Sequence, residues 1–251
     1  MYTYFLALGY KGAKYAGFQI QDNAQTIQGE IEKAAAIYLR APLSLTGSSR
    51  TDAGVHARLN YFHFQSELEL GDEFTYHVNA ILPSDIVVKG VYKVPEGSHS
   101  RFDAVARRYT YHLYGAKDPF QEDRAWFYPY PMDESLLNEA ALSLLGEHDF
   151  TSFAKTRTQV YTHICRIETC YWESTTTGWI LTIEGSRFLR GMVRALVATM
   201  VKVGRGKMTV SDFIQIRMAM NSKLADFSAP AHGLHLDCVI YPESISQFLG
   251  E

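Results

Sequence analysis

The segment Thr26-Ile27-Gln28-Gly29-Glu30-Ile31-Glu32-Lys33-Ala34-Ala35-Ala36-Ile37-Tyr38 has a helical pattern and follows a strand-like segment at residues 2–9. Thr26 is a residue type that caps helix N-termini. Apolar residues then recur at helical spacing, at Ile27, Ile31, Ala34, Ala35 and Tyr38. The chain therefore begins with a strand, followed by a helix that packs through one face.

The same kind of alternation continues to residue 94. Short strand-like runs at residues 43–46 and 59–64 flank a loop, and a helical pattern then starts at Asp72 with Phe74, Val78 and Ile81 on one face. Residues 86–94 form a further strand-like run. The resulting order β-α-β-β-α-β is that of a split βαβ, ferredoxin-like unit, in which two helices cover one face of an antiparallel sheet.

A second set of elements starts after residue 104. Tyr109, Tyr111 and Leu113 alternate with polar residues as in a strand, and a helix is expected from Asp133. Strands are expected at 164–172, 179–183 and 234–241, and helices at 188–203 and 210–220. We therefore predict an α+β protein of two ferredoxin-like halves, residues 1–104 and 105–251, with the active-site cleft between them.

Composition sets limits on the class of protein. The 251 residues are 47% apolar, which suffices for a packed core, and no apolar run approaches the ~20 residues of a membrane helix. The N-terminus lacks the layout of a signal peptide. Three cysteines without a C-x-x-C pair argue against a disulfide scaffold or a zinc ribbon. A soluble cytoplasmic protein is the expectation.

The distribution of charge is more informative than its total. A net charge of -3 lacks the basic footprint typical of nucleic-acid binders. Between Gly185 and Ser211, however, the charged residues are all basic: Arg187, Arg190, Arg194, Lys202, Arg205 and Lys207. The spacing of the first three predicts one shared helix face, which is either a solvated basic face or a set of phosphate contacts.

The loop expected between the strands at 43–46 and 59–64 concentrates reactive side chains. Arg50 and Asp52 are separated by one threonine, so in an extended segment both point the same way. Thr51, Asp52 and Gly54 are also ordinary turn residues, which makes a structural turn the plain alternative. A guanidinium beside a carboxylate in a cleft suits an anionic polymer as ligand.

The run Arg50-Thr51-Asp52-Ala53-Gly54-Val55-His56-Ala57 resembles the R-T-D-A-G-V-H-A signature of the bacterial tRNA pseudouridine synthase A family. Seven further segments resemble family blocks in the same order and cover nearly the whole chain: residues 17–19, 26–29, 79–83, 100–104, 107–111, 149–153 and 188–194. The chain departs from the family pattern at Ser49, where glycine is usual, and at Phe18, Ser100 and Ala198, where tryptophan, alanine and glycine are common. Of these departures, only Ser49 bears on the backbone conformation of the Asp52 loop, since glycine permits torsions that serine resists.

The resemblance implies an activity and a set of roles. Asp52 would be the nucleophile or base that breaks the N1 glycosidic bond of uridine, so that uracil reattaches through C5. Addition to the base, attack on the sugar carbon and removal of a sugar proton all remain open. Arg194 would lie beside the aspartate. Tyr109 would pack on the target uracil, and Tyr111 is its neighbour on the same strand. Arg50 would hold the vacated space or an adjacent phosphate, whereas His56 stabilises the loop.

The resemblance also implies partners. The substrate would be tRNA, at uridines 38, 39 and 40 of the anticodon stem-loop, the enzyme would need no cofactor, and it would be a homodimer. Two alternatives remain. A non-catalytic RNA-binding module would also use a ferredoxin-like sheet, and a zinc-dependent hydrolase could be built from His163, Cys165, His232 and His235.

Overall fold

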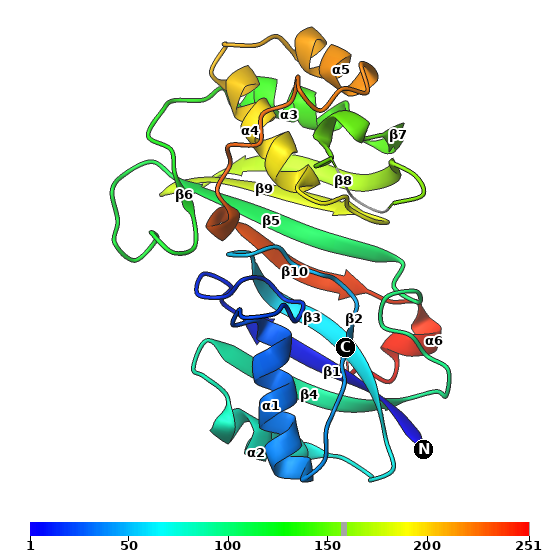
Figure 1. Cartoon of the computed structure of the whole chain (residues 1–251). Helices are drawn as coiled ribbons and strands as arrows, with labels where there is room; N and C mark the ends of the chain where they lie inside the picture. Colours follow the sequence, from blue (N-terminus) through cyan, green and yellow to red (C-terminus); the bar gives the residue numbers. More distant parts are fainter. Residues whose placement is uncertain (157–159, 251) are drawn as a thin grey trace. The chain divides into compact units, whose positions relative to one another are not determined.

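The computed structural model describes residues 1–156 and 160–250 and divides the chain into two compact units (Figure 1). Unit 1 comprises Met1–Arg107 together with the segment from His235 onward, and unit 2 comprises Arg108–Leu234. The expected halves were 1–104 and 105–251, so the structure differs in assigning the C-terminal segment to unit 1. Periodicity indicates that a strand exists at the C-terminus, but it does not reveal which strand it pairs with.

Unit 1 has the predicted β-α-β-β-α-β order. Its elements are β1 (Tyr2–Tyr10), α1 (Ile27–Leu39), β2 (Thr46–Gly47), β3 (His56–Ser66), α2 (Asp72–Ile81), β4 (Ile86–Val94), β10 (Leu234–Ile240) and α6 (Glu243–Ser246). β1 is central and pairs antiparallel with β3 and β4. β2 pairs antiparallel with β3 in one part of that strand, and β10 pairs parallel with it elsewhere, through His235 and His56. The α+β class is confirmed.

Both faces of β1 are covered, which explains its almost continuous apolar sequence. On one face Tyr4 stacks on Phe64, which in turn packs against Phe74 of α2. On the other face Phe5 lies 5.4 Å, ring to ring, from Tyr241. Tyr241 follows directly after β10, so the C-terminal segment contributes to the cover of this second face and belongs to unit 1.

Local side chains explain where the unit 1 elements begin and end. Thr26 caps α1 as expected, its side chain accepting the Gly29 N–H. The prediction of a strand at 43–46 is wrong, because the backbone groups of Leu45 bind side chains of α1 instead of a neighbouring strand. The Leu45 N–H donates to the Glu32 carboxylate at 2.8 Å, and its carbonyl accepts from the Gln28 amide at 3.0 Å. Only Thr46–Gly47 is left to pair with β3. Ile81 is the last residue of α2 and is 41% exposed rather than buried.

Unit 2 is also a sheet covered by helices. Its elements are β5 (Ala106–Tyr114), β6 (Trp126–Phe127), α3 (Glu134–Leu142), β7 (Gly146–Asp149), η1 (Thr151–Phe153), β8 (Ile164–Ser174), β9 (Gly178–Gly185), α4 (Met192–Gly204), α5 (Val210–Met218) and η2 (Ala231–Gly233). Its sheet runs in the order β5-β9-β8-β7, with β6 beside β5. The helix α3 packs on β8 and contacts both α4 and α5. Asp133 caps α3, as the sequence predicts.

The helix α4 corrects one prediction about the arginines. Every residue of α4 except Arg194 and Lys202 is buried, so the helix is a core element rather than an amphipathic surface helix. It starts at Met192, after Gly191, which has a φ of 74°. The predicted helix over 188–203 is therefore wrong at its start. Arg187 and Arg190 lie in the loop between β9 and α4 and do not share a helix face with Arg194.

In the part of the chain that the structure describes, no helix is long and apolar enough to cross a bilayer.

Candidate active site

The loop that carries Asp52 connects β2 and β3 and is shaped by its own backbone. The Val55 N–H donates to the Asp52 carbonyl at 3.1 Å, which closes a tight turn. Gly54 has a φ of 81°, a conformation that favours glycine within that turn. Of the described non-glycine residues, only Asn23, Arg40 and Met220 have a positive φ. Ser49 therefore adopts an ordinary conformation, and the departure from the family's glycine does not strain the loop.

A buried hydrogen-bond network anchors the loop to the sheet of unit 1. The hydroxyl groups of Tyr10 and Thr51 are 2.8 Å apart, and the Asn60 amide donates to the Tyr10 hydroxyl at 3.2 Å and to the Ser49 carbonyl at 2.9 Å. All four residues are buried. Burial raises the pKa of Tyr10 to about 12, so the hydroxyl keeps its proton at neutral pH. The loop is thereby fixed on both sides of Arg50.

Sequence reasoning did not identify Tyr10 or Asn60. A signal for Asn60 was present, since an asparagine inside the apolar run Leu59–Phe64 needs partners for its amide when it is buried. Tyr10 lies at the end of an apolar strand and carried no such signal.

A second loop, residues 11–25, packs against the Asp52 loop from another side. Gly17 has a φ of +105°, and a Cβ placed there would lie 3.1 Å from the Thr51 carbonyl oxygen and 3.2 Å from the Ala53 nitrogen. The next residue, Phe18, donates its N–H to the Thr51 carbonyl at 3.0 Å. Its ring stacks on Phe62 at 4.1 Å, so phenylalanine fills the position where the family commonly has tryptophan. The carbonyl and side chain of Thr51 are thus both held.

Burial alternates along the loop as an extended segment predicts. Ser49 and Thr51 are buried, whereas Arg50 is exposed and Asp52 is partly exposed. The two charged side chains therefore occupy the accessible positions on either side of a buried threonine. His56 is 2% exposed, and its Nδ1 accepts the Gly12 N–H at 3.2 Å. This contact supports the structural role predicted for His56.

In unit 2, Arg194 and Tyr111 each donate a hydrogen bond to one of two consecutive backbone carbonyl groups. Arg194, in the first turn of α4, donates from Nε to the Ala229 carbonyl at 2.7 Å. Tyr111 is fully buried and donates its hydroxyl to the next carbonyl, that of Pro230, at 2.8 Å. Burial raises the pKa of Tyr111, and the positive charge of Arg194 opposes that shift. The Ala229 carbonyl therefore fixes the orientation of the Arg194 guanidinium, and Tyr111 holds the Ala229–Pro230 segment from within the core.

Tyr109 differs from Tyr111 in being only half-buried. Its ring meets Phe188 edge to face, with the ring centres 5.1 Å apart. A half-buried tyrosine supported by a second ring retains surface for a ligand. Arg50 and Asp52 belong to unit 1 and Tyr109 and Arg194 to unit 2, so the approach of these two pairs stays a prediction.

The remaining candidates take different positions. Arg187 is half-buried, and Arg190 is exposed on the rim of a pocket in unit 2. For the zinc alternative, no three His, Cys, Asp or Glu residues gather into a metal-binding group within residues 1–156 and 160–250. Burial raises the pKa of the Cys165 thiol to about 11, which disfavours the thiolate that zinc requires.

An aspartate at the accessible position of an anchored loop, on a split βαβ unit, agrees with the pseudouridine synthase class that the run at residues 50–57 resembles. Comparison with known proteins agrees: a family model described as "tRNA pseudouridine synthase" matches residues 140–242. The chain is 42% identical over 247 residues to tRNA pseudouridine synthase A of Parabacteroides distasonis, with 98% of each chain covered. It is 44% identical over 245 residues to the protein of that name from Bacteroides fragilis, covering 96% of this chain and 97% of the other. It is also 38% identical over 240 residues to that of Staphylococcus aureus strain Newman, with 94% and 90% covered. The chain belongs to the tRNA pseudouridine synthase A family.

Proposed function

We propose that this protein converts uridine to pseudouridine in tRNA and that Asp52 is its catalytic residue. The observation that carries the proposal is the anchoring of the Asp52 loop, in which Thr51 is held by Tyr10 and Phe18 while Asp52 itself stays accessible. A carboxylate in a fixed position lowers the barrier of a reaction by avoiding the cost of orienting it for each turnover. Membership in the family supports tRNA as the substrate.

The reaction needs one carboxylate and conserves all atoms. The N1–C1′ bond of uridine breaks, a C5–C1′ bond forms, N1 gains a proton and C5 loses one to water. Asp52 in its ionised form can add to the base, attack C1′ or remove a sugar proton, and in each case it is regenerated at the end. The oxidation state of the nucleotide is unchanged.

Four arginines and a tyrosine complete the proposed site. The target nucleotide has to leave its helix before N1 and C5 can be reached, and Tyr109 would then pack on the extracted base. Arg194 would support the ionised Asp52, and Arg50 would hold the vacated space or the neighbouring phosphate. Arg187 and Arg190 would contact phosphates further along the RNA. Uridines 38, 39 and 40 of the anticodon stem-loop are the proposed targets.

The oligomeric state and cell compartment are also proposals that rest on the resemblance. A cytoplasmic homodimer is expected, and light scattering coupled to gel filtration measures the mass of the particle in solution. A mass near 28.4 kDa, that of one chain, would contradict the dimer.

The decisive experiment follows the proton that leaves C5. The parent enzyme should release tritium from tRNA labelled at uridine C5, while the RNA keeps its length. Asp52→Asn keeps the shape of the side chain and removes its charge, so it should bind tRNA and release essentially no label. Glu67→Gln removes an exposed carboxylate elsewhere in unit 1 and should behave like the parent. Release by Asp52→Asn at the parent rate would place the reactive group elsewhere, and binding without release by the parent would favour the non-catalytic RNA-binding module.

A further inference from the structure

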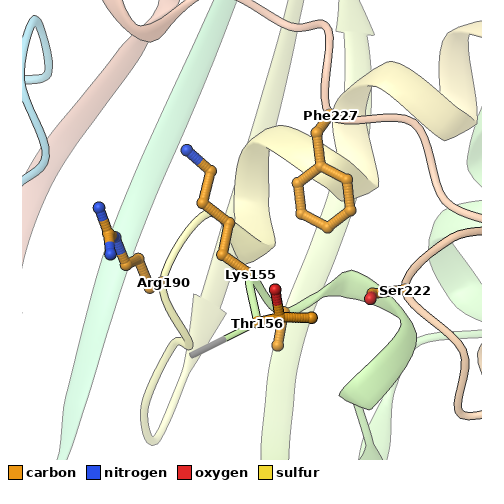
Figure 2. A pocket seen from close by; sticks show the side chains of 6 residues that line it. Lys155, Thr156, Arg190, Ser222 and Phe227 are labelled. Carbon is orange, nitrogen blue, oxygen red and sulfur yellow. The ribbon is translucent and has the colours of Figure 1, made fainter. Parts of the chain in front are cut away.

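A pocket in unit 2 includes Arg190, one of the proposed phosphate contacts, but none of its other lining residues has a role in the proposed function. Its volume is about 340 Å³, and it is lined by Ala154, Lys155, Thr156, Arg190, Ser222 and Phe227 (Figure 2). The lining comes from the segment after η1, the loop before α4 and the segment after α5. It combines two cations, two hydroxyl groups and one aromatic ring, and contains no acid. The volume is at the lower end of ligand pockets, which measure about 300–1,000 Å³.

The two cations come from segments that are bonded to each other. The Lys155 N–H donates to the Arg190 carbonyl at 3.0 Å. The aliphatic part of Lys155 then passes over Gly191, where an added Cβ would lie 3.0 Å from its Cγ and 3.3 Å from its Cδ. Glycine at 191 therefore lets the lysine lie close to the backbone. In Figure 2 the Lys155 side chain lies between those of Arg190 and Phe227.

The acid nearest to the pocket in sequence is already engaged elsewhere. Asp226, which precedes Phe227, binds the Lys202 ammonium at 2.7 Å and accepts the Ser228 N–H at 2.8 Å. Two cations around one small pocket without an acid in its lining create a positive potential that favours an anion. Phe227 is half-buried, so part of its ring can accept a flat group.

We infer that this pocket binds one nucleotide of the RNA substrate other than the target uridine. The phosphate would bind Lys155 and Arg190, the base would pack on Phe227, and the hydroxyl groups of Thr156 and Ser222 would bond the sugar or the phosphate. Because the lining offers no carboxylate, the nucleotide is held there and not transformed. The inference rests on the proposed function, which makes RNA the polyanion that the protein meets.

Binding and chemistry can be tested separately. Binding of tRNA is measured in the Asp52→Asn background, so that turnover does not contribute. The double variant Lys155→Met/Arg190→Met should lower the slope of log K against log salt by about 0.9, the value for one phosphate contact in a duplex, or about 0.7 in a single strand. Phe227→Leu should weaken binding roughly five- to 150-fold, the range for loss of one stacked base, whereas Phe227→Tyr keeps a ring and should bind like the parent. Lys117→Met removes an exposed lysine of unit 2 and serves as the control.

Each result decides a different point. The inference would be overturned if the double variant kept the parent's salt slope or if Phe227→Leu kept the parent's affinity. The proposed function would still stand in that case, provided that the parent enzyme releases tritium. Absence of that release would instead overturn the function. Uridine 5′-monophosphate is the second probe. If the variants lost affinity for the monophosphate but bound tRNA like the parent, the pocket would serve a free nucleotide and the inference would again fall. Equal thermal unfolding of parent and variants confirms that each is folded.

Discussion

Tyr10→Phe tests whether the anchoring of the Asp52 loop matters for the reaction. The change removes only the hydroxyl group that lies 2.8 Å from Thr51 Oγ1 and accepts the Asn60 amide at 3.2 Å. Asn60 keeps its bond to the Ser49 carbonyl, but the buried Thr51 hydroxyl loses this partner. Leaving one buried polar group unsatisfied costs about 1–3 kcal/mol of unfolding free energy.

The effect on the reaction should exceed the effect on stability. Thr51 directly precedes Asp52, so a loosened threonine lets the carboxylate leave its productive position. A misplacement of about 1 Å can reduce a rate on the order of a hundredfold, and we expect a ten- to hundredfold slower single turnover at saturating tRNA. Affinity for tRNA should change little, because the loss is one of position rather than of contact with RNA.

Tyr4→Phe provides a matched control on the same strand. Tyr4 is also buried, and its hydroxyl accepts one hydrogen bond, from the Leu70 N–H at 3.0 Å, far along β1 from Thr51. Tyr4→Phe should lower the unfolding free energy by an amount similar to Tyr10→Phe and leave the single-turnover rate unchanged. If Tyr10→Phe slowed the reaction no more than Tyr4→Phe at equal loss of stability, the network would be a feature of the core alone.

Three further predictions follow from the same contacts. Gly17→Ala and Gly97→Ala both place a side chain at positive φ, which costs about 1–2 kcal/mol, but only the alanine at 17 meets the Thr51 and Ala53 backbone. Single-turnover rates should therefore fall for Gly17→Ala alone, and equal rates for the two variants would show that the packing of Gly17 on the Asp52 loop does not matter for the reaction. Tyr109→Phe should keep tRNA affinity better than Tyr109→Leu, because it keeps the stacking ring; equal affinity and rate for the leucine variant would make Tyr109 a core residue only. Burial raises the pKa of Tyr10 from its ordinary 10.0 to about 12 in the folded protein, so between these pH values the unfolded state holds fewer protons, and the unfolding free energy falls as pH rises through them. In urea titrations Tyr10→Phe should weaken that fall, and an identical pH dependence in the variant would contradict the raised pKa.

The sequence predicted the elements of unit 1 well because periodicity and capping are local properties. Residues 86–94 form a strand as expected, and Thr26 caps α1. The segment at 43–46 failed because Glu32 and Gln28, distant in sequence, take up the backbone groups of Leu45. The start of α4 failed because helical spacing of the arginines continues across Gly191, whose positive φ no periodicity reveals. Long-range partners and single torsions were therefore the parts beyond prediction.

The candidate site divides along the same line. Motifs led to Arg50, Asp52, Tyr109 and Arg194 as candidate site residues, which remain predictions, whereas no motif pointed to Tyr10 and Asn60, which hold the loop. The difference has a physical origin. A reactive residue is recognised by its own chemistry, but a supporting residue acquires its role only from what it contacts after folding.

Alternation within the loop lets one short segment be anchored in the core and still present charged side chains at accessible positions. In an extended backbone successive side chains point to opposite sides, so Thr51 can be buried and bonded to Tyr10 while Arg50 and Asp52 remain accessible. A helical turn would place neighbours about 100° apart and could not separate anchor from reactive group at a spacing of one residue. Phe18 holds the Thr51 carbonyl as well, so the backbone next to the carboxylate is restrained through both its side chain and its peptide group. The loop therefore alternates like a short strand, with Thr51 as the buried anchor and Asp52 at the accessible position beside it.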